Sequence, residues 1–157
     1  MHQEQEAFMQ EAIRLSVDKM QEGHGGPFGA VVVRHNQVIA RGYNNVLRSN
    51  DPTAHAEVEA IRKASQLLGT PDLSDCELYT SCEPCPMCLG AIYWARLRKV
   101  YYGNTRHDAA AIGFDDAFIY DELDKDPGER AIPMEQYMRP EAQQAFAVWE
   151  QKDDKKG

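Results

Sequence analysis

The sequence lacks any long run of apolar residues. No segment of the 157-residue chain approaches the roughly twenty consecutive apolar residues that a transmembrane helix requires. Residues 1–6 are polar and acidic, and the basic stretch and apolar run of a secretory signal are missing, so we expect no such signal. These absences argue against a membrane-embedded or secreted protein.

Positive charge is scarce. The chain has 17 lysines and arginines against 25 acidic residues, which gives a formal net charge of −8. No block of basic residues occurs apart from Lys155-Lys156 near the C-terminus. Proteins that bind nucleic acids mainly by neutralising phosphates carry clustered Lys and Arg, so we expect neither a nucleic acid nor a membrane as partner.

Cysteine is also scarce, and its four occurrences do not suggest a disulfide framework. Cys76 and Cys82 lie in or beside an apparent strand, whereas Cys85 and Cys88 form a C-x-x-C motif. A chain of this length buries about two-thirds of its unfolded surface without such cross-links. We therefore expect one domain, residues 1–157, in a reducing cytoplasm.

Two motifs supply the residues of a catalytic metal site. They are His55-Ala56-Glu57 and Pro84-Cys85-Pro86-Met87-Cys88. A catalytic zinc site keeps its fourth position for water, whereas a structural site closes with four protein ligands. We therefore interpret His55, Cys85 and Cys88 as the three ligands of one Zn²⁺. Zinc lowers the pKa of bound water to about 7, and Glu57 is the base that takes up the released proton.

The spacing of the first motif places it at the start of a helix. Residues two apart on a helix point about 200° away from each other, so His55 and Glu57 can meet only at a helix end. Pro52 and Thr53 are typical of a first helical turn, and apolar residues follow at helical intervals from Val58.

The second motif has the same form. Prolines flank Cys85, and the apolar run 87–95 is long enough for a buried helix. Two helix N-termini would then face one zinc ion. Their partial positive charge favours thiolate over thiol and stabilises a developing oxyanion, which suits both metal binding and hydrolysis.

A C-x-x-C motif alone is a weak signal, because it also occurs in redox pairs and in structural zinc sites. Together with the H-x-E motif upstream and the preceding proline, it matches the signature of zinc-dependent base deaminases. We expect no metal contact from Cys82, since the three-ligand site needs no fourth thiolate.

These motifs and their surroundings resemble the cytidine deaminase-like superfamily and, within it, the bacterial guanine deaminases. The likeness covers nearly the whole chain and includes Gly25-Gly26-Pro27-Phe28-Gly29-Ala30, Asn44-Asn45, 51–57, 79–96 and Gly113-Phe114-Asp115-Asp116. The resemblance implies a three-layer α/β fold, one Zn²⁺ per chain, and deamination of guanine to xanthine and ammonia in purine catabolism or salvage. In such enzymes hydroxide on the zinc attacks C2 of the base, while the carboxylate at the position of Glu57 moves protons.

The hydrophobic pattern agrees with the α/β class. Apolar residues at steps of three and four predict an amphipathic helix over 3–22, and residues 30–33 and 37–41 predict a hairpin. Strands at 77–81 and 99–103 alternate with the two metal-site helices. This order predicts a mixed sheet of about five strands with helices on both faces.

The pattern is weaker beyond residue 104. Residues 109–123 are compatible with a short helix, and residues 132–138 with a strand or an extended segment. Residues 141–152 form a final helix-like stretch, and its apolar side chains need a surface to cover.

Phe28 and Asn44 are candidates for substrate binding. By residue type alone, the segment around Phe28 is typical of a turn into a strand, and Asn44 of an ordinary turn. The resemblance favours ligand roles, because similar guanine deaminases stack the purine on an aromatic ring at the first position and contact the base from the second. An Asn amide can pair with the N7 and O6 edge of guanine.

Asp116 and Trp94 are further candidates. Asp116 has the residue type of a turn cap, but a carboxylate is the natural acceptor for N1–H and the exocyclic amine of guanine, and motif alignment favours it over Asp115. Trp94 is by type a core residue, and the resemblance makes it a pocket wall. The other histidines lack metal-ligand spacing and are expected on the surface: His2, His24, His35 and His107.

The resemblance also implies a homodimer. A C-terminal segment, residues about 131–157, would be exchanged between subunits and close the partner's pocket. Similar bacterial enzymes end in an aromatic residue that reaches the site, whereas this chain ends in Asp154-Lys155-Lys156-Gly157. The chain thus departs from the family pattern at the lid.

Three other functions share parts of these motifs. A tRNA adenosine deaminase uses the same metal motifs on a flipped base, but the acidity of the chain and Phe114-Asp115-Asp116 argue against it. A deaminase of another small ring, such as cytosine or a triazine, would use the same metal chemistry. A zinc-stabilised binding module would hold the metal without turnover.

Overall fold

A computed structural model describes residues 2–155. The last two residues of the C-terminal segment that is predicted to be exchanged, Lys156 and Gly157, lie outside the described residues. The chain forms two compact units, Met1–Ala117 and Phe118–Gly157, called here the first and second unit. Within the described residues, no helix is both long enough and apolar enough to cross a bilayer.

A four-stranded sheet forms the centre of the first unit. Its strands are β1 (Gly29–Arg34), β2 (Gln37–Tyr43), β3 (Cys76–Cys82) and β4 (Lys99–Asn104), in the order β2-β1-β3-β4. β1 is antiparallel to both of its neighbours, and β3 is parallel to β4. The predicted mixed sheet is confirmed, with four strands among the described residues where about five were expected.

The predicted hairpin is confirmed by β1 and β2. Its two turn residues, His35 and Asn36, have left-handed φ angles of 49° and 64°. Two successive left-handed residues make the turn type whose twist matches that of the flanking strands, and Asn tolerates this conformation better than most residues. Arg34 and Gln37 form the closing pair of the register.

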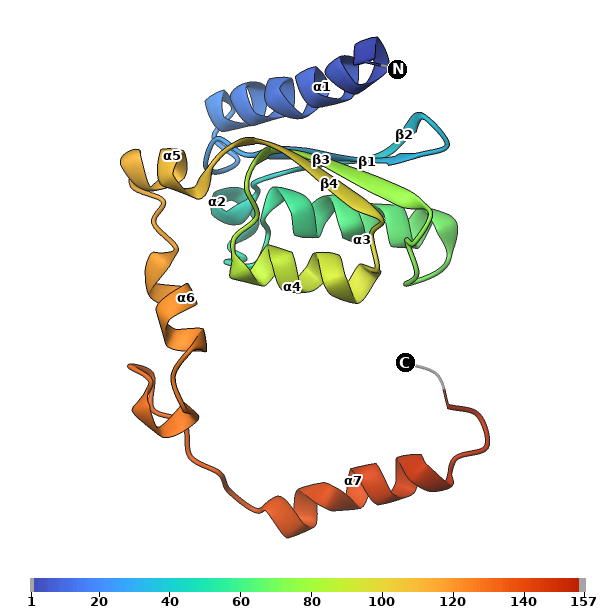
Figure 1. The fold of residues 1–157 in the computed structure, drawn as a ribbon, viewed down its shortest axis with the longest axis vertical. Helices are drawn as coiled ribbons and strands as arrows, with labels where there is room; N and C mark the ends of the chain where they lie inside the picture. The colour runs from blue at the N-terminus through green and yellow to red at the C-terminus, as the bar shows by residue number, and fades with distance from the viewer. Residues whose placement is uncertain (1, 156–157) are drawn as a thin grey trace. The chain divides into compact units, whose positions relative to one another are not determined.

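Helices cover both faces of the sheet (Figure 1). α1 (His2–Gln21) lies on one face, whereas α3 (Ala56–Leu68) and α4 (Pro86–Ala95) lie on the other. β1 is central and covered on both sides, which explains why its residues 29–33 are all buried and why its sequence is continuously apolar. The three-layer α/β arrangement is therefore as predicted.

Each face of the sheet has its own apolar cluster. The larger one contains small side chains of α3 together with residues of the strands and α4: Ala30, Val32, Ala40, Ala56, Ala60, Ala64, Leu73, Cys76, Leu78, Ile92 and Ala95. The smaller one joins Val31, Val33 and Tyr79 to the apolar side of α1.

Gly42 fixes the distance between β2 and the start of α3. A Cβ atom at this position would lie 2.2 Å from the carbonyl oxygen of Ala56 and 2.5 Å from the amide nitrogen of Ala60. The strand and the helix backbone therefore approach so closely that only glycine fits. This contact seats the N-terminal turn of α3 directly on the sheet.

Two short helices complete the first unit: α2 (Val46–Ser49) follows β2, and α5 (Arg106–Ala111) follows β4. Thr105 caps α5, because its side chain accepts a hydrogen bond from the amide of Asp108, whose carboxylate accepts from the Thr105 amide. The predicted short helix over 109–123 is instead two helices. α5 ends before Gly113, whose φ of 99° breaks the helix, and α6 starts later.

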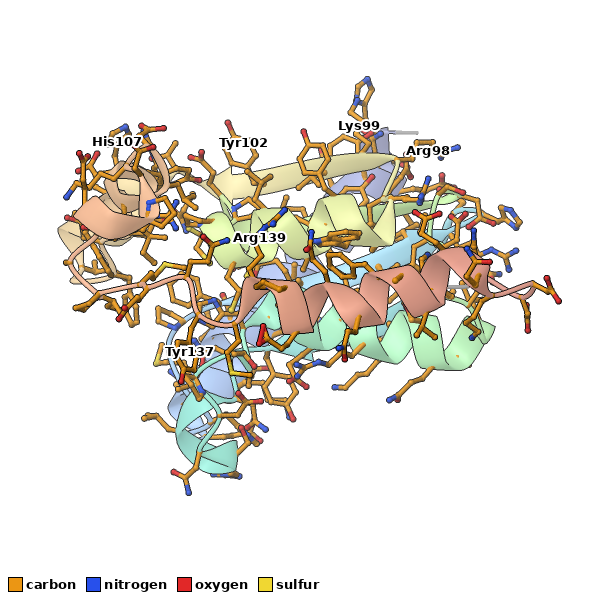
Figure 2. All side chains as sticks on the ribbon, turned by 90° about the horizontal axis from the view of Figure 1, so that it is seen from below. Arg98, Lys99, Tyr102, His107, Tyr137 and Arg139 are labelled. Atoms are coloured by element: carbon orange, nitrogen blue, oxygen red, sulfur yellow. The ribbon has the colours of Figure 1, made fainter. Side chains whose placement is uncertain are left out.

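The second unit consists of short helices joined by irregular segments. It contains α6 (Ala117–Leu123), which begins at the boundary, η1 (Pro127–Glu129) and α7 (Arg139–Gln151). α7 confirms the predicted final helix, and Figure 2 marks Arg139 at its start. Residues 132–138 are irregular, so the strand considered there is absent from the structure. None of the described residues 118–155 is buried.

Candidate metal centre and active site

α3 places His55 and Glu57 at one helix end. His55 is the N-cap residue, with extended φ and ψ of −78° and 156°, and the helix begins at Ala56. The prediction that Pro52 and Thr53 open the helix was wrong. The Asp51 side chain accepts hydrogen bonds from the amide and hydroxyl of Thr53 at 2.8 and 2.7 Å, so these residues form a separate turn before the helix.

α4 presents the second motif in the same way. Cys85 is the N-cap residue with φ −70° and ψ 171°, Pro86 occupies the first turn, and Cys88 is fully buried in that turn. Proline is favoured in a first turn because its missing N–H would have no helical partner there. The two helices thus bring their N-termini to one point, as the sequence predicted.

His55, Cys85 and Cys88 form what we call the metal cluster. The Nδ1 atom of His55 lies 3.6 Å from the Cys85 sulfur and 3.5 Å from the Cys88 sulfur. All three ligand atoms lie within 4.8 Å of one another. A nitrogen about 2.1 Å and a sulfur about 2.3 Å from one tetrahedral zinc ion would be about 3.6 Å apart, so the cluster fits Zn²⁺.

The metal cluster favours a thiolate even without a cation. A hydrogen bond from the Cys88 side chain, with a further contribution from His55, lowers the pKa of Cys85 below its ordinary value. The pKa of Cys88 is raised by its contact with Cys85 and by burial. The pKa of His55 is raised by its contact with Cys85. A bound cation would favour the second thiolate as well, because metal ligation deprotonates thiols.

Glu57 is a buried carboxyl next to the metal cluster and is not one of its three ligands. Only 6% of the residue is exposed. Burial raises the pKa of Glu57 to about 7, and the thiolate of Cys85 acts in the same direction. A carboxyl with such a pKa can accept and return a proton near neutral pH, which is what a general acid–base requires.

Asn44 follows β2 and is buried. Its side-chain Oδ1 accepts a hydrogen bond from the backbone amide of Val46 at 3.0 Å, and its backbone amide donates to the carbonyl of Phe28 at 3.1 Å. Because Oδ1 is used locally, the Nδ2 hydrogens are the donors that the side chain can offer to a ligand. The hydrogen bond to Oδ1 thus fixes the orientation of the Asn44 side-chain amide.

Phe28 is half-buried and meets a ring that the sequence analysis had not singled out. Its ring packs edge-to-face against Phe114, with centroids 5.0 Å apart and planes at 86°. Gly26 permits this contact, since a Cβ there would lie 2.9 Å from the Phe114 ring. A signal was available, because Phe114 belongs to the same family-like string, Gly113-Phe114-Asp115-Asp116, as Asp116, but the pairing with Phe28 is long-range.

Asp115 and Asp116 have different surroundings. The carboxylate of Asp115 accepts a hydrogen bond from the amide of Ala117 at 2.9 Å and so stabilises the local turn. Asp116 is half-buried, and its pKa is raised by burial and by the negative charge of Cys85, against the opposing effect of Arg106. The carboxyl of Asp116 therefore interacts electrostatically with Cys85 of the metal cluster, whereas the carboxylate of Asp115 is used in a local hydrogen bond.

Trp94 lies apart from the residues above. It is 86% exposed and lines a groove of about 540 Å³ between α3 and α4, together with Ile61 and Arg62. It sits near the C-terminal end of α4, whereas the metal cluster is at the N-terminal end. Its role as a pocket wall stays a prediction.

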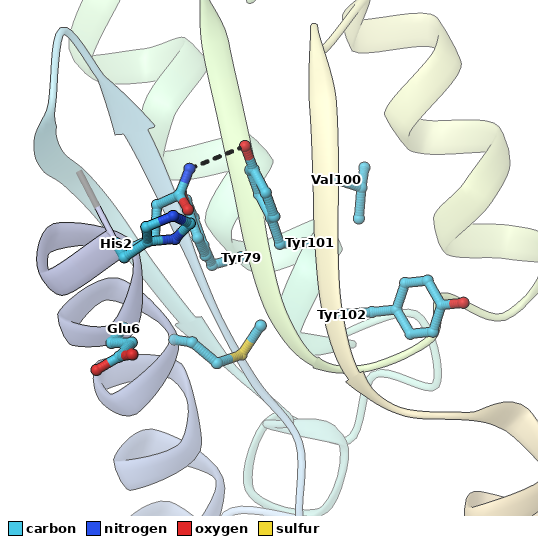
Figure 3. A pocket seen from close by; sticks show the side chains of 8 residues that line it. His2, Glu6, Tyr79, Val100, Tyr101 and Tyr102 are labelled. Carbon is cyan, nitrogen blue, oxygen red and sulfur yellow. Dashed lines mark hydrogen bonds between the residues drawn. The ribbon is translucent and has the colours of Figure 1, made fainter.

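A second hollow, of about 430 Å³, lies between α1 and strands β3 and β4 (Figure 3). Tyr79, Tyr101 and Tyr102 contribute to its lining, and Gln5 donates a hydrogen bond to the Tyr101 hydroxyl at 3.3 Å. Tyr102 lies on β4 (Figure 2). This residue is 51% exposed. The hollow includes no residue of the metal cluster.

Comparison with known proteins identifies the family. Residues 2–104 match the model of the cytidine and deoxycytidylate deaminase zinc-binding region. The matched segment contains α1, the whole sheet and both metal-site helices. It ends before Phe114 and Asp116.

Three similar proteins extend this match. Guanine deaminase of Bacillus subtilis is 55% identical over 151 residues, which cover 96% of this chain and 97% of that one. Its solved structure superposes with a TM-score of 0.94 over 97% of each chain. A protein solved in complex with 2,6-diaminopurine is 39% identical, with a TM-score of 0.68 over 71% of this chain and 62% of that one.

The third similar protein is the tRNA-specific adenosine deaminase of Agrobacterium fabrum. It is 49% identical over 77 residues, which cover 49% of this chain and 51% of that one. The shared part is therefore about half of each protein. With a matched zinc-binding region, a near-complete structural match and a metal cluster at two helix N-termini, the chain belongs to the zinc-dependent cytidine and deoxycytidylate deaminase family.

Proposed function

We propose that the protein is a zinc-dependent guanine deaminase that hydrolyses guanine to xanthine and ammonia. The observation that carries this proposal is a buried carboxyl, Glu57, beside a metal cluster of three protein ligands, where a structural zinc site has four. The full-length similarity to the Bacillus subtilis enzyme supports guanine as the substrate. The reaction breaks the bond between C2 and the exocyclic nitrogen and forms a C2–oxygen bond.

The metal cluster would hold one Zn²⁺ through one imidazole nitrogen and two sulfurs. When bound, the ion supplies a Lewis acid that lowers the pKa of a water ligand to about 7. The helix N-termini at His55 and Cys85 add partial positive charge, which stabilises the thiolates and negative charge that develops on the substrate.

Glu57 moves the protons in this proposal. It takes up a proton from the attacking water and returns protons to the purine ring and to the departing amine, which leaves as ammonia. Burial suits this role, because it raises the pKa of Glu57 to about 7 and so brings the charged and neutral forms close in free energy. The place of Glu57 in the first turn of α3, two residues after His55, keeps the carboxyl beside the metal cluster.

Three residues bind the base in this proposal. Phe28 stacks on the purine, and its own ring is held by Phe114. Asn44 donates from Nδ2 to the acceptor edge of guanine, since its Oδ1 is already paired. Asp116 accepts from N1–H and the amine.

We further propose a homodimer with an exchanged C-terminal segment, residues about 131–157. The second unit has apolar side chains without cover, among them Phe146 at 74% exposure. The outer side of α4 is equally apolar and uncovered, with Tyr93 76% exposed. Sedimentation of the full chain tests this: a dimer that Phe146→Ser converts to monomer supports the exchange, and a monomeric parent contradicts it.

The location that suits this chemistry is the cytoplasm. All four cysteines are free thiols, and two of them must stay reduced to bind a metal. A reducing compartment preserves that state.

The second candidate is deamination of adenosine in tRNA, which the half-length similarity to the Agrobacterium enzyme favours. The net charge of −8 opposes it, because binding tRNA requires neutralisation of phosphates. Ammonia release from tRNA but not from guanine would select this candidate.

The Glu57→Gln variant tests the proposed role of the carboxyl. We expect full zinc content and an unchanged melting temperature or a higher one, with kcat for guanine lowered by about 10² to 10⁴. Glu59→Gln, on the same helical turn and paired with Arg62, is the control and should keep its activity. Loss of zinc and of fold in Glu57→Gln would show instead that the carboxyl is structural.

A further inference from the structure

We propose that His24 is a positioning residue that holds Asn44 in place for the purine. This inference rests on the proposed function, because it takes Asn44 as a ligand of the base. His24, expected on the surface, is only partly exposed and has partners on both sides of Asn44.

The backbone of His24 connects three segments. Its amide donates to the carbonyl of Lys19 at the end of α1, at 3.1 Å. Its carbonyl accepts from the amides of Leu47 and Arg48 in α2, at 3.1 and 3.3 Å. His24 is therefore anchored before its side chain makes any contact.

The imidazole bonds to the residue after Asn44. Its Nδ1 lies 2.8 Å from Oδ1 of Asn45, and its Nε2 lies 3.3 Å from Nη1 of Arg48. Arginine can only donate, so Nε2 is the acceptor and Nδ1–H donates to Asn45. A second nitrogen of Arg48 donates to the carbonyl of Glu22 at 2.6 Å, which fixes the guanidinium.

The imidazole also packs against the residue before Asn44. The ring of His24 meets the ring of Tyr43 edge-to-face, with centroids 4.9 Å apart and planes at 70°. The Tyr43 ring is held from other sides by Lys19 and Lys63, whose Nζ atoms lie 5.0 and 5.2 Å from its centroid. Both chain neighbours of Asn44 thus contact His24.

Gly25 completes the support. A Cβ at Gly25 would lie 2.1 Å from Oδ1 of Asn44, so the backbone after His24 lies directly against the Asn44 side chain. The amide of Asn45 in turn donates to the carbonyl of Ala54 at 2.9 Å, one residue before the metal ligand His55. The His24–Asn45 bond therefore sets the position of Asn44 relative to the metal cluster.

This geometry predicts an effect on KM and not on kcat. Asn44 contacts the acceptor edge of guanine, and that edge keeps its hydrogen bonds while the reaction proceeds at C2. An interaction that is equally strong in ground state and transition state changes KM alone when it is weakened.

Three substitutions of His24 separate its contacts. His24→Asn places an amide nitrogen where Nδ1 was, and so keeps the bond to Asn45. His24→Gln extends to the position of Nε2 and keeps only the bond from Arg48. His24→Phe keeps the ring edge against Tyr43 and loses both hydrogen bonds.

Steady-state kinetics on the zinc-loaded full chain with guanine tests the proposal. We expect KM to rise about fivefold in His24→Phe and His24→Gln, with kcat within about twofold, and KM within about twofold in His24→Asn. Affinity for 2,6-diaminopurine, measured by calorimetry in a Glu57→Gln background so that its C2 amine is not hydrolysed, should follow the same order.

Two results would overturn the proposal: an unchanged KM in His24→Phe, or a KM in His24→Asn as high as in His24→Phe. A parallel fall of melting temperature and kcat at constant KM would show a structural role only. If the affinities of the variants for 2,6-diaminopurine follow the expected order but the parent protein releases no ammonia from guanine, the proposed function fails and the positioning role stands. If the parent neither binds the purine nor turns over guanine, both fail.

Discussion

The two units of the chain differ in what they bury. The first unit has an apolar cluster on each face of its sheet, and several of its side chains are completely buried. The second unit contains an amphipathic helix, α7, and several large apolar residues, yet none of its described residues is buried. The difference shows that a helical pattern is sufficient for a helix, whereas burial needs an opposing surface.

The candidate site residues all belong to the well-packed first unit. Each member of the metal cluster, and Glu57, is the N-cap or lies in the first turn of a helix whose apolar side packs on the sheet. Sub-ångström placement of metal ligands requires such rigid support. The uncovered apolar residues of the second unit are suited to contact another molecule, since exposed apolar patches mark interaction surfaces.

The largest effect is expected in the first unit, when the metal cluster can no longer bind its ion. Cys88→Ala removes one of three ligands, so we expect the zinc content to fall and the activity on guanine to drop by at least about a thousandfold, because water without the metal is a poor nucleophile at neutral pH. Metal analysis and ammonia release measure this. Cys82→Ala is the control, since the Cys82 thiol lies outside the metal cluster.

The next effect concerns the core of the first unit. Leu78→Ala, at a fully buried position of β3, should lower the free energy of unfolding by about 2–5 kcal/mol. Urea titration followed by circular dichroism measures it. A loss below about 1 kcal/mol would mean that the sheet is less tightly packed than the structure shows.

Alkaline pH should destabilise the first unit through Cys76. Burial, with the neighbouring Asp75, raises the pKa of Cys76 from 9.0 to about 11. Below pH 9 both states keep the proton; between pH 9 and 11 only the native state keeps it, so stability falls as pH rises, by up to about 3 kcal/mol. Urea titrations at both pH values should show a smaller fall in Cys76→Ala than in the parent. Equal falls would contradict the shift.

The smallest effect is expected in the second unit. Leu123 is 59% exposed, so Leu123→Ala should change the free energy of unfolding by less than about 0.5 kcal/mol. The same urea titration applies. A loss comparable to that of Leu78→Ala would show that this leucine is covered in solution and would remove the contrast between the units.

The parts of the fold that local pattern determines were predictable. The β1–β2 hairpin followed from two apolar runs around a short polar turn, and the register confirms it. The two motifs placed His55, Cys85 and Cys88 at helix starts because ligand spacing and proline positions leave few alternatives. The exact start of α3 was not predicted, because Thr53 donates hydrogen bonds to the Asp51 side chain and so belongs to a turn before the helix.

Long-range contacts were not predictable from the sequence. His24 lacks metal-ligand spacing, and nothing local reveals that its ring reaches Asn45 and Tyr43. The pairing of Phe28 with Phe114 joins residues far apart in the chain. The segment 132–138 was read as a strand or an extended segment, and the structure shows no strand there, because strand pairing depends on long-range partners that the local pattern does not reveal.

The central claim is that this family member deaminates guanine. The most direct measurement is release of ammonia, together with formation of xanthine, by the purified zinc-loaded protein offered guanine, with cytosine, adenine, nucleosides and tRNA in parallel. We predict stoichiometric xanthine and ammonia from guanine. Turnover of another base with no reaction of guanine would contradict the assignment of Phe28, Asn44 and Asp116 to this purine, and no turnover of any base would contradict the enzymatic role itself.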